Sequence, residues 1–458
     1  MFNFEEFRNY LKSIFKSGSF VQNVSIVFSG NVLNFLIQFG STPIISRIFG
    51  PEAYGEYAYY NLIITNILFV GGMSLPEVYL IPRERYKFLA LGKIVVSSVV
   101  LITLISLIFY TLFRDLMDTP IPLVFITIIT IRLIIGPINA VLGSINSRRK
   151  KFSKNVFIHI SGTVLAKSSV IIAGLYGLVS GLGLLLGDLL RSIYSVGLQV
   201  ELKNAIIFFR YLFKNNWKEV WNTLKEYKGV VYYLFPSQVL NKWTGDLVIL
   251  GIGLIYSETV LGLYVFAATI LNIPITLIEN SIRPVLFQKA VEVSQTNNGD
   301  LGYYYLKTLR IVPILSGGLI FILSGFANLI FPFVFGDKWA SAGMIVPLMS
   351  IQYLASALIA PYDSFWRILK KEKELLRNNI FSLLFRYSPL VFIFFHLSEH
   401  LFVLIISIGS FLGSMFMHYK LSKLLLKPTT SRNVIISSIF FVLLASTLSY
   451  LLSLVIVL

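Results

Sequence analysis

Long apolar stretches separated by short polar connections occupy nearly the whole chain. A helix crosses about 30 Å of hydrocarbon with roughly 20 apolar residues, and thirteen stretches meet that requirement. The predicted spans are residues 20–46, 57–81, 89–113, 121–146, 155–178, 180–202, 230–255, 259–282, 307–335, 341–363, 377–396, 400–424 and 433–457. The pattern therefore predicts an all-α polytopic membrane protein with 12 to 14 spans.

An internal repeat relates the first predicted span and its following connection, Ser46–Tyr57, to the seventh span with an offset of 207 residues. The clearest identical pairs are Phe28 and Phe235, Val32 and Val239, Leu33 and Leu240, Asn34 and Asn241, Ile48 and Ile255, Gly55 and Gly262, and Tyr57 and Tyr264. Duplication on this scale in an apolar chain is typical of a transporter built from two related halves. We therefore expect two pseudo-symmetric six-helix lobes around a central cavity.

The repeat and the spans together predict four segments. Residues 1–202 form the first lobe, residues 203–229 a linker, residues 230–426 the second lobe, and residues 427–458 one additional span. In the linker, Trp217, Val220, Trp221 and Leu224 form an apolar stripe among lysines, which predicts an interfacial helix on the cytoplasmic side. Residues 1–16 have a similar spacing and predict a second helix on the cytoplasmic surface.

Composition supports the membrane assignment, and the placement of charge predicts the orientation. Of the residues, 56% are hydrophobic and 13% are charged, and the formal net charge is +17. The basic residues gather in alternate connections, which is the positive-inside pattern of a protein in the cell membrane with a cytoplasmic N-terminus. The basicity therefore indicates contact with anionic headgroups and does not imply a nucleic-acid partner.

Several ionisable residues lie near the middle of predicted spans, where an unpaired charge is costly. The cations at that depth are Arg132, Lys167, Arg191, Lys242 and Arg386, and the acids are Asp188 and Asp246. Asp188 and Arg191 are three residues apart and Lys242 and Asp246 four apart, so each pair shares a helix face. These four residues either neutralise one another or line a cavity; for Arg132 and Lys167 we favour the cavity.

Polar residues also form a stripe on the first helix of each lobe. The stripes are Asn31, Asn34 and Gln38 in the first lobe, and Ser237, Gln238 and Asn241 in the second. Such groups suit sugar hydroxyls in a cavity, or they merely fasten helices together. Asp188, Asp246 and Glu56 are candidates for ion coupling. No metal site, cofactor or ATP-binding motif is predicted.

The chain resembles the polysaccharide transporter family. The resemblance is carried by SRIFGPEAYGEYAYYN at 46–61, by the stretch from YYLFPSQVLNKW at 232 to ATILNIP at 274, and by FGDKW at 335–339. Members are flippases for lipid-linked oligosaccharides of the O-antigen, capsule and exopolysaccharide type. They belong to the multidrug/oligosaccharidyl-lipid/polysaccharide exporter superfamily, whose fold is a V-shaped pair of six-helix lobes.

This resemblance implies transport and not enzymatic activity. An undecaprenyl-type diphosphate oligosaccharide would pass from the cytoplasmic to the outer leaflet by alternating access, and Arg132, Lys167, Arg191 and Lys242 would attract its diphosphate. A polysaccharide polymerase and chain-length proteins of a lipopolysaccharide-type pathway are candidate partners. The alternatives are a multidrug/cation antiporter of the same fold, a membrane-embedded polymerase or glycosyltransferase, and a scaffold of an assembly complex.

Overall fold

The computed structural model of the chain is helical throughout the part it describes. That part comprises residues 20–116, 121–295, 301–310, 312–362, 365–369, 371–388 and 397–457, and it contains no strand. The surface helix predicted for residues 1–16 lies outside these ranges. The all-α prediction is confirmed for the described residues.

Eight helices in the described part are long and apolar enough to cross a membrane, or nine if one bent pair counts as a single span. The bent pair, residues 317–325 and 327–335, changes direction by 61°. The span predicted at 307–335 is therefore broken, into α12 (Leu301–Leu309), α13 (Val312–Gly325), α14 (Ala327–Ile330) and a π-helical turn at Phe331–Phe335. The sequence did not reveal the bend, because residues 311–335 form one uncharged, mainly apolar run.

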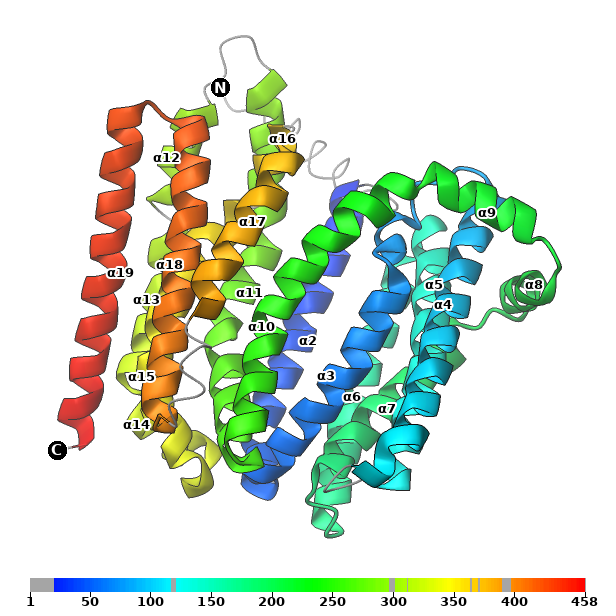
Figure 1. The fold of residues 1–458 in the computed structure, drawn as a ribbon, viewed down its shortest axis with the longest axis horizontal. Helices are drawn as coiled ribbons and strands as arrows, with labels where there is room; N and C mark the ends of the chain where they lie inside the picture. Colours follow the sequence, from blue (N-terminus) through cyan, green and yellow to red (C-terminus); the bar gives the residue numbers. More distant parts are fainter. Residues whose placement is uncertain are drawn as a thin grey trace, which may run out of the picture. The chain divides into compact units, whose positions relative to one another are not determined.

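The chain forms two compact units. Unit 1 comprises residues 1–48 and 60–238, and unit 2 comprises residues 49–59 and 239–458. The division therefore falls inside the helix that follows the linker, and a short segment of the first repeat groups with unit 2. Figure 1 shows the helices in sequence colours.

Unit 1 is a helical bundle. Its helices are α2 (Phe20–Ile48), most of α3 (Pro51–Gly72), α4 (Arg85–Phe113), α5 (Leu123–Arg148), α6 (Phe152–Leu175), α7 (Gly181–Gln199), α8 (Leu202–Phe213) and α9 (Trp217–Glu226). The most extensive contacts join α6 to α7 and to α2, and α7 to α5. Gly187 permits the α6–α7 contact, because a methyl group there would lie 2.4 Å from Val170 Cγ2 and 2.9 Å from the Ala166 carbonyl oxygen.

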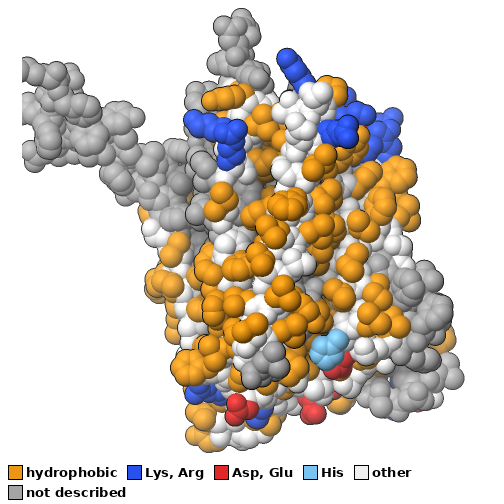
Figure 2. Space-filling view, turned by 90° about the vertical axis from the view of Figure 1, so that its left-hand side faces the viewer, with side chains coloured by type: hydrophobic (Ala, Val, Ile, Leu, Met, Phe, Trp, Pro, Cys, Tyr) orange, Lys and Arg blue, Asp and Glu red, His pale blue; other side chains and the backbone are white. Residues whose placement is uncertain are grey.

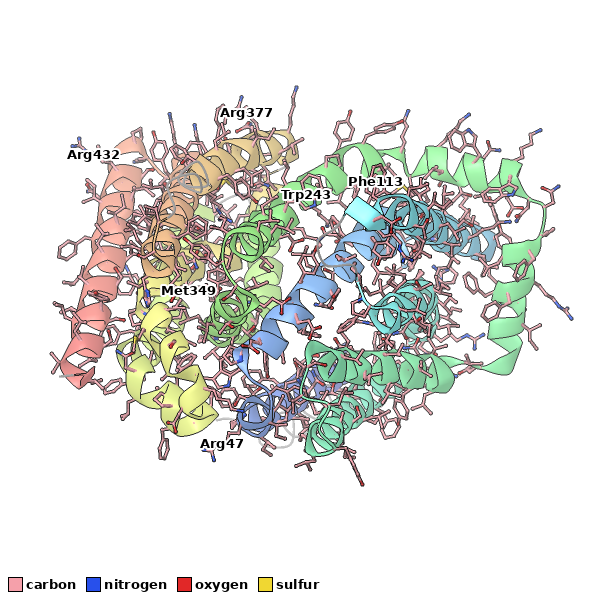
Figure 3. The ribbon with its side chains drawn as sticks, turned by 60° about the horizontal axis from the view of Figure 1, so that its bottom comes forward. Arg47, Phe113, Trp243, Met349, Arg377 and Arg432 are labelled. Atoms are coloured by element: carbon pink, nitrogen blue, oxygen red, sulfur yellow. The ribbon has the colours of Figure 1, made fainter. Side chains whose placement is uncertain are left out.

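Unit 2 holds the other helices. They are α10 (Phe235–Ile255, from residue 239), α11 (Glu258–Gln295), α12 to α14, α15 (Ala340–Ile359), α16 (Phe365–Ile368), α17 (Glu372–Tyr387), α18 (Glu399–Leu425) and α19 (Pro428–Val457). Phe266, Trp339 and Met349 lie in the buried core, and Tyr54 packs edge-on against the first two rings. Figure 3 labels Met349 among the side chains of this core. Tyr54 explains why residues 49–59 group with unit 2.

One face of unit 2 has the surface expected of a membrane protein. Figure 2 shows apolar side chains across the middle of this face, most of the Lys and Arg at one end, and Asp and Glu together with a few Lys or Arg near the other. The additional helix α19 contributes large exposed apolar residues, including Phe440, Leu451 and Val455. An apolar belt with a basic end is the pattern that a lipid bilayer selects.

Helix boundaries reproduce the sequence repeat. Helix α2 ends at Ile48 and α10 at Ile255, while α3 begins at Pro51 and α11 at Glu258. Both pairs are separated by 207 residues, as in the sequence alignment. The connection itself is shorter than predicted, because only residues 49 and 50 separate α2 from α3, and Pro51 is the first helical residue. Proline is favoured there, because the backbone N–H at the first helical position has no hydrogen-bond partner within the helix, so its absence costs nothing.

Candidate functional site

A polar cavity of about 370 Å³ lies within unit 1, among α5, α6 and α7. Ten residues line it: Arg132, Asn139, Asn155, Ile158, His159, Asp188, Arg191, Ser192, Ser195 and Gln199. Only Ile158 is apolar. Within helices long and apolar enough to cross a membrane, such a concentration of polar groups needs a ligand, a partner or water.

Helix α7 supplies half of the lining. Asp188, Arg191, Ser192, Ser195 and Gln199 follow one another at intervals of one, three or four residues, so they share one face of the helix. The residues on the opposite side of the helix, such as Leu190 and Ile193, are exposed apolar side chains. Amphipathic patterning thus directs the polar face of α7 toward the cavity.

Asp188 forms an ion pair with Arg132, which comes from a different helix. Arg132 Nη2 lies 3.5 Å from Asp188 Oδ2, and Arg132 Nη1 donates to Asn61 Oδ1 at 3.3 Å. The side chain of Arg132 is 14% exposed and that of Asp188 is 29% exposed, so the pair is largely shielded but still reaches the cavity. From the sequence, the only ion-pair partner expected for Asp188 was Arg191 on the same helix, and no partner was expected for Arg132. The α5–α7 packing corrects that expectation.

Arg191 contacts a neutral histidine. Its Nη2 lies 2.9 Å from His159 Nε2. A guanidinium group can only donate, so His159 Nε2 accepts and the imidazole is uncharged. The lining therefore contains two guanidinium groups and one carboxylate, which gives it a net charge of +1.

Two amide oxygens in the cavity have no hydrogen-bond partner among the residues that the structure describes. They are Asn139 Oδ1 and Gln199 Oε1, and both atoms are buried. A buried acceptor without a donor costs about 1–3 kcal/mol. The cavity therefore presents acceptors for hydroxyl or N–H donors beside guanidinium groups that suit oxyanions.

The other residues predicted for the site lie elsewhere. Lys167 is half-buried on α6 and does not line this cavity. Lys242 and Asp246 form an ion pair within α10, with Nζ and Oδ2 2.7 Å apart, as their spacing predicted. Both residues belong to unit 2. The four cations were predicted to share one cavity. For Lys242 this stays a prediction. Lys167 does not line the cavity of unit 1.

The described side chains of the polar stripes do not line this cavity. On α2, Asn34 is buried while Asn31 and Gln38 are exposed, so the three side chains do not share one environment. On α10, Gln238 Oε1 accepts from Ser74 Oγ at 2.6 Å and its Nε2 donates to Glu77, which favours the fastening role for Gln238.

Three further predicted residues have less defined surroundings. Ser237 is half-buried on α10, and Glu56 is half-buried at the start of α3 in unit 2. The side chain of Asn241 lies outside the described part of the chain. Their predicted roles in sugar binding and ion coupling stay predictions.

Sequence reasoning missed six polar residues of the lining. They are Asn139, Asn155, His159, Ser192, Ser195 and Gln199. The missed signal is the helical spacing of polar residues in the predicted span 180–202, which we analysed only in the first span of each lobe. Asn155 and His159 on α6 show the same spacing of four.

Glu201 organises the end of the bundle next to this cavity. Its carboxylate contacts Arg149 Nη1 at 2.7 Å, Lys151 Nζ at 2.5 Å and Lys154 Nζ at 3.5 Å. The hydrogen bond from Lys151, followed by the charges of the three cations, lowers the pKa of Glu201 below its ordinary value of 4.5. This exposed cluster joins the α5–α6 connection to the segment that follows α7.

Comparison with known protein families gives a match over most of the chain. A family model described as "Polysaccharide biosynthesis protein" matches residues 44–343. No curated protein sequence matches the chain.

Solved structures resemble the chain over nearly its whole length. The lipid II flippase MurJ in an inward closed conformation has a TM-score of 0.62 with 14% identity, covering 94% of this chain and 97% of MurJ. An inward-facing multidrug resistance MATE family transporter of the MOP superfamily has a TM-score of 0.57 with 14% identity, covering 91% and 98%. A MOP superfamily transporter from Pyrococcus furiosus, described as having a binding pocket of reverse polarity, has a TM-score of 0.50 with 14% identity, covering 91% and 95%. At these identities the likeness establishes the fold.

Proposed function

The chain belongs to the polysaccharide biosynthesis protein family and has the fold of MOP superfamily transporters, and from this premise we propose that it is a flippase for a lipid-linked saccharide. The substrate is a polyprenyl-diphosphate oligosaccharide of the O-antigen, capsule or exopolysaccharide type. It moves from the cytoplasmic to the outer leaflet by alternating access, and the chain is a multi-pass protein of the cell membrane with a cytoplasmic N-terminus.

One observation carries this proposal: a polar, net cationic cavity lies inside a unit built from membrane-spanning helices. A diphosphate is an oxyanion, and guanidinium groups bind oxyanions through charge-assisted, often bidentate hydrogen bonds. Sugar hydroxyls donate hydrogen bonds that the unpartnered oxygens of Asn139 and Gln199 lack. The polyprenyl tail stays in lipid while the headgroup crosses the polar path.

Arg132 and Arg191 have different roles in the cavity. Arg132 is held by Asp188 and Asn61 and so has a fixed orientation. Among the described residues, Arg191 is held by a neutral imidazole and forms no ion pair with a carboxylate, so its charge is less compensated than that of Arg132. We assign Arg191 the main contact with the diphosphate. Lys167 and Lys242 attract the substrate along the path, and Asp246 and Glu56 remain candidates for ion coupling.

The competing function is a multidrug/cation antiporter of the same fold. That function needs an anionic binding site, whereas the only carboxylate in this lining, Asp188, is paired with Arg132. A membrane-embedded polymerase or glycosyltransferase and a scaffold remain further alternatives.

The test is flipping of a polyprenyl-diphosphate oligosaccharide in proteoliposomes. We expect wild-type protein to flip the lipid and Arg191→Gln to lose at least about tenfold in rate, the equivalent of one charge-assisted contact. The matched control is Arg114→Gln, because Arg114 is 60% exposed at the end of α4 and does not line the cavity. Wild-type protein that extrudes an organic cation but flips no saccharide lipid would establish the antiporter instead.

A further inference from the structure

The outer face of α8 joins an apolar strip to two cations. A cavity of about 480 Å³ on this face is lined by Ile206, Phe209, Arg210, Phe213 and Lys214. On a helical projection these five side chains fall on the side opposite Phe208. Phe208 is fully buried, whereas Phe213 is 88% exposed. The helix therefore has one face docked in the protein and one face that lacks a protein partner within the described residues.

The docked face fixes α8 on α4. Phe208 lies over Gly92 of α4, where a methyl group would be 3.0 Å from Phe208 Cε2. Gly92 is seven residues after the first residue of α4, which places the contact about 10 Å along that helix from its end. That depth corresponds to the boundary between headgroups and hydrocarbon for a helix that crosses the bilayer.

Helix α8 runs across α4. Figure 1 shows α4 from the side and α8 end-on, and Figure 3, turned by 60°, shows α8 lengthwise while α4 is strongly foreshortened. A helix that crosses a spanning helix at the headgroup boundary lies in the plane of the interface, with its apolar face toward the acyl chains.

The segment after α8 is fastened on its inner side, so the outer face is preformed. Lys93 of α4 is buried, and its Nζ donates to the carbonyl oxygen of Lys214 at 2.6 Å and to Asn216 Oδ1 at 2.9 Å. The same ammonium group lies 4.6 Å from the centre of the Trp217 ring. Tyr211 of α8 donates to Glu219 of α9 at 2.8 Å. These contacts hold the backbone at Lys214 and leave its side chain in the outer cavity.

The charge of the segment favours an anionic ligand. Residues 202–229 contain six basic and two acidic residues. Both carboxylates are engaged, Glu219 by Tyr211 and Glu226 by Lys87 at 2.9 Å. Among the described residues, no ion pair joins Arg210 or Lys214 to a carboxylate. These two cations are four residues apart and line the same cavity as the apolar strip, just as a phosphate and an acyl chain are neighbours in a phospholipid.

We propose that the outer face of α8 is a binding site for an anionic glycerophospholipid. Its phosphate lies between Arg210 and Lys214, and an acyl chain lies along Ile206, Phe209 and Phe213. The site is separate from the polar cavity of unit 1, and it does not depend on the proposed transport function.

The test is native mass spectrometry of the full-length protein, with phosphatidylglycerol and phosphatidylcholine of the same chain length. Wild-type protein retains phosphatidylglycerol preferentially. Replacing both cations, in Arg210→Gln/Lys214→Gln, lowers that retention roughly 25-fold, since each basic residue near the surface contributes about 1 kcal/mol. The matched control is Lys225→Gln/Lys228→Gln, which removes the same charge from the end of α9 and leaves retention within about twofold.

Three outcomes overturn the proposal. Equal retention of the two lipids by wild-type protein shows that the face does not select anionic headgroups. An equal loss in both double variants shows a general charge effect and no site at α8. Displacement of phosphatidylglycerol by inorganic phosphate alone shows a phosphate site without a lipid component. Phe213→Ser adds a check on the acyl contact, because this exposed side chain contributes little to folding, and the variant is expected to weaken lipid retention.

Discussion

Gly55 and Gly262 face each other where α3 crosses α11 in unit 2. A methyl group on Gly55 would lie 1.9 Å from the carbonyl oxygen of Glu258, and one on Gly262 would lie 1.8 Å from the carbonyl oxygen of Pro51. Both the glycines and their carbonyl partners are 207 residues apart. Within unit 2, the repeated segments 51–55 and 258–262 therefore contact each other around a local pseudo-twofold axis.

We predict that Gly262→Ala destabilises the protein by about 1–3 kcal/mol, because the added methyl group meets backbone that cannot move aside like a side chain. Thermal unfolding in detergent measures the effect. Gly245→Ala on α10 is the control, since nothing lies within 4 Å of a methyl group there. Equal melting temperatures for the two variants would contradict the close crossing.

The sequence predicted this part of the fold well. The repeat and the apolar runs located the end of α2, the end of α10 and the start of α11 to within two residues. The other ends were predicted less well, because α3 begins six and ends nine residues earlier than its predicted span, and α11 extends 13 residues beyond its predicted end. These features are local, so they can be found without knowledge of packing. The bend inside residues 307–335 could not, because an apolar run has the same composition whether straight or broken.

The site was only partly predictable. Arg132, Arg191 and Asp188 stood out because charge in an apolar span is rare, and all three line the cavity. Their partners were not predictable, since the Arg132–Asp188 and Arg191–His159 contacts join different helices. Spacing along a single helix reports only neighbours on that helix.

Substitution of Asp188 should change substrate binding in opposite directions in a flippase and in a cation antiporter. Asp188→Asn removes the only carboxylate of the lining and raises its net charge from +1 to +2. We expect binding of a polyprenyl diphosphate to become about fivefold tighter, from roughly 1 kcal/mol of removed repulsion. Equilibrium binding in detergent measures it. For a cation transporter the same change weakens binding of the organic cation, and that result would reject the flippase.

Glu201 predicts a dependence of stability on pH. Its pKa is lowered in the folded protein, chiefly by the hydrogen bond from Lys151, so its stabilisation is present above the unfolded pKa and is lost as pH falls through the folded pKa. Because the cluster is exposed, the contribution is about 1 kcal/mol or less. Wild type should melt slightly above Glu201→Gln at pH 7 and lose this advantage below pH 4.5, the ordinary value. A constant difference from pH 7 to pH 3 would contradict the pairing.

A disulfide across the crossing tests whether the two repeats separate during transport. Glu52 and Thr259 are also related by 207 residues, and Thr259 Oγ1 lies 3.4 Å from Glu52 Oε1. The chain contains no cysteine, so in a Glu52→Cys/Thr259→Cys variant an intramolecular disulfide can join only these two positions. If alternating access requires this crossing to open, oxidation should lower flipping in proteoliposomes at least about tenfold, and reduction should restore it.

The control is Ser422→Cys/Ser431→Cys, which joins α18 to α19 at two hydroxyl groups 2.8 Å apart. Both helices belong to unit 2, and we expect oxidation of this pair to leave flipping unchanged. Full activity of oxidised Glu52→Cys/Thr259→Cys would show that the crossing stays closed throughout the cycle. Residues 49–59 would then move with unit 2, and the bend that permits transport would lie in α3 after Tyr59, where the chain passes from one unit to the other.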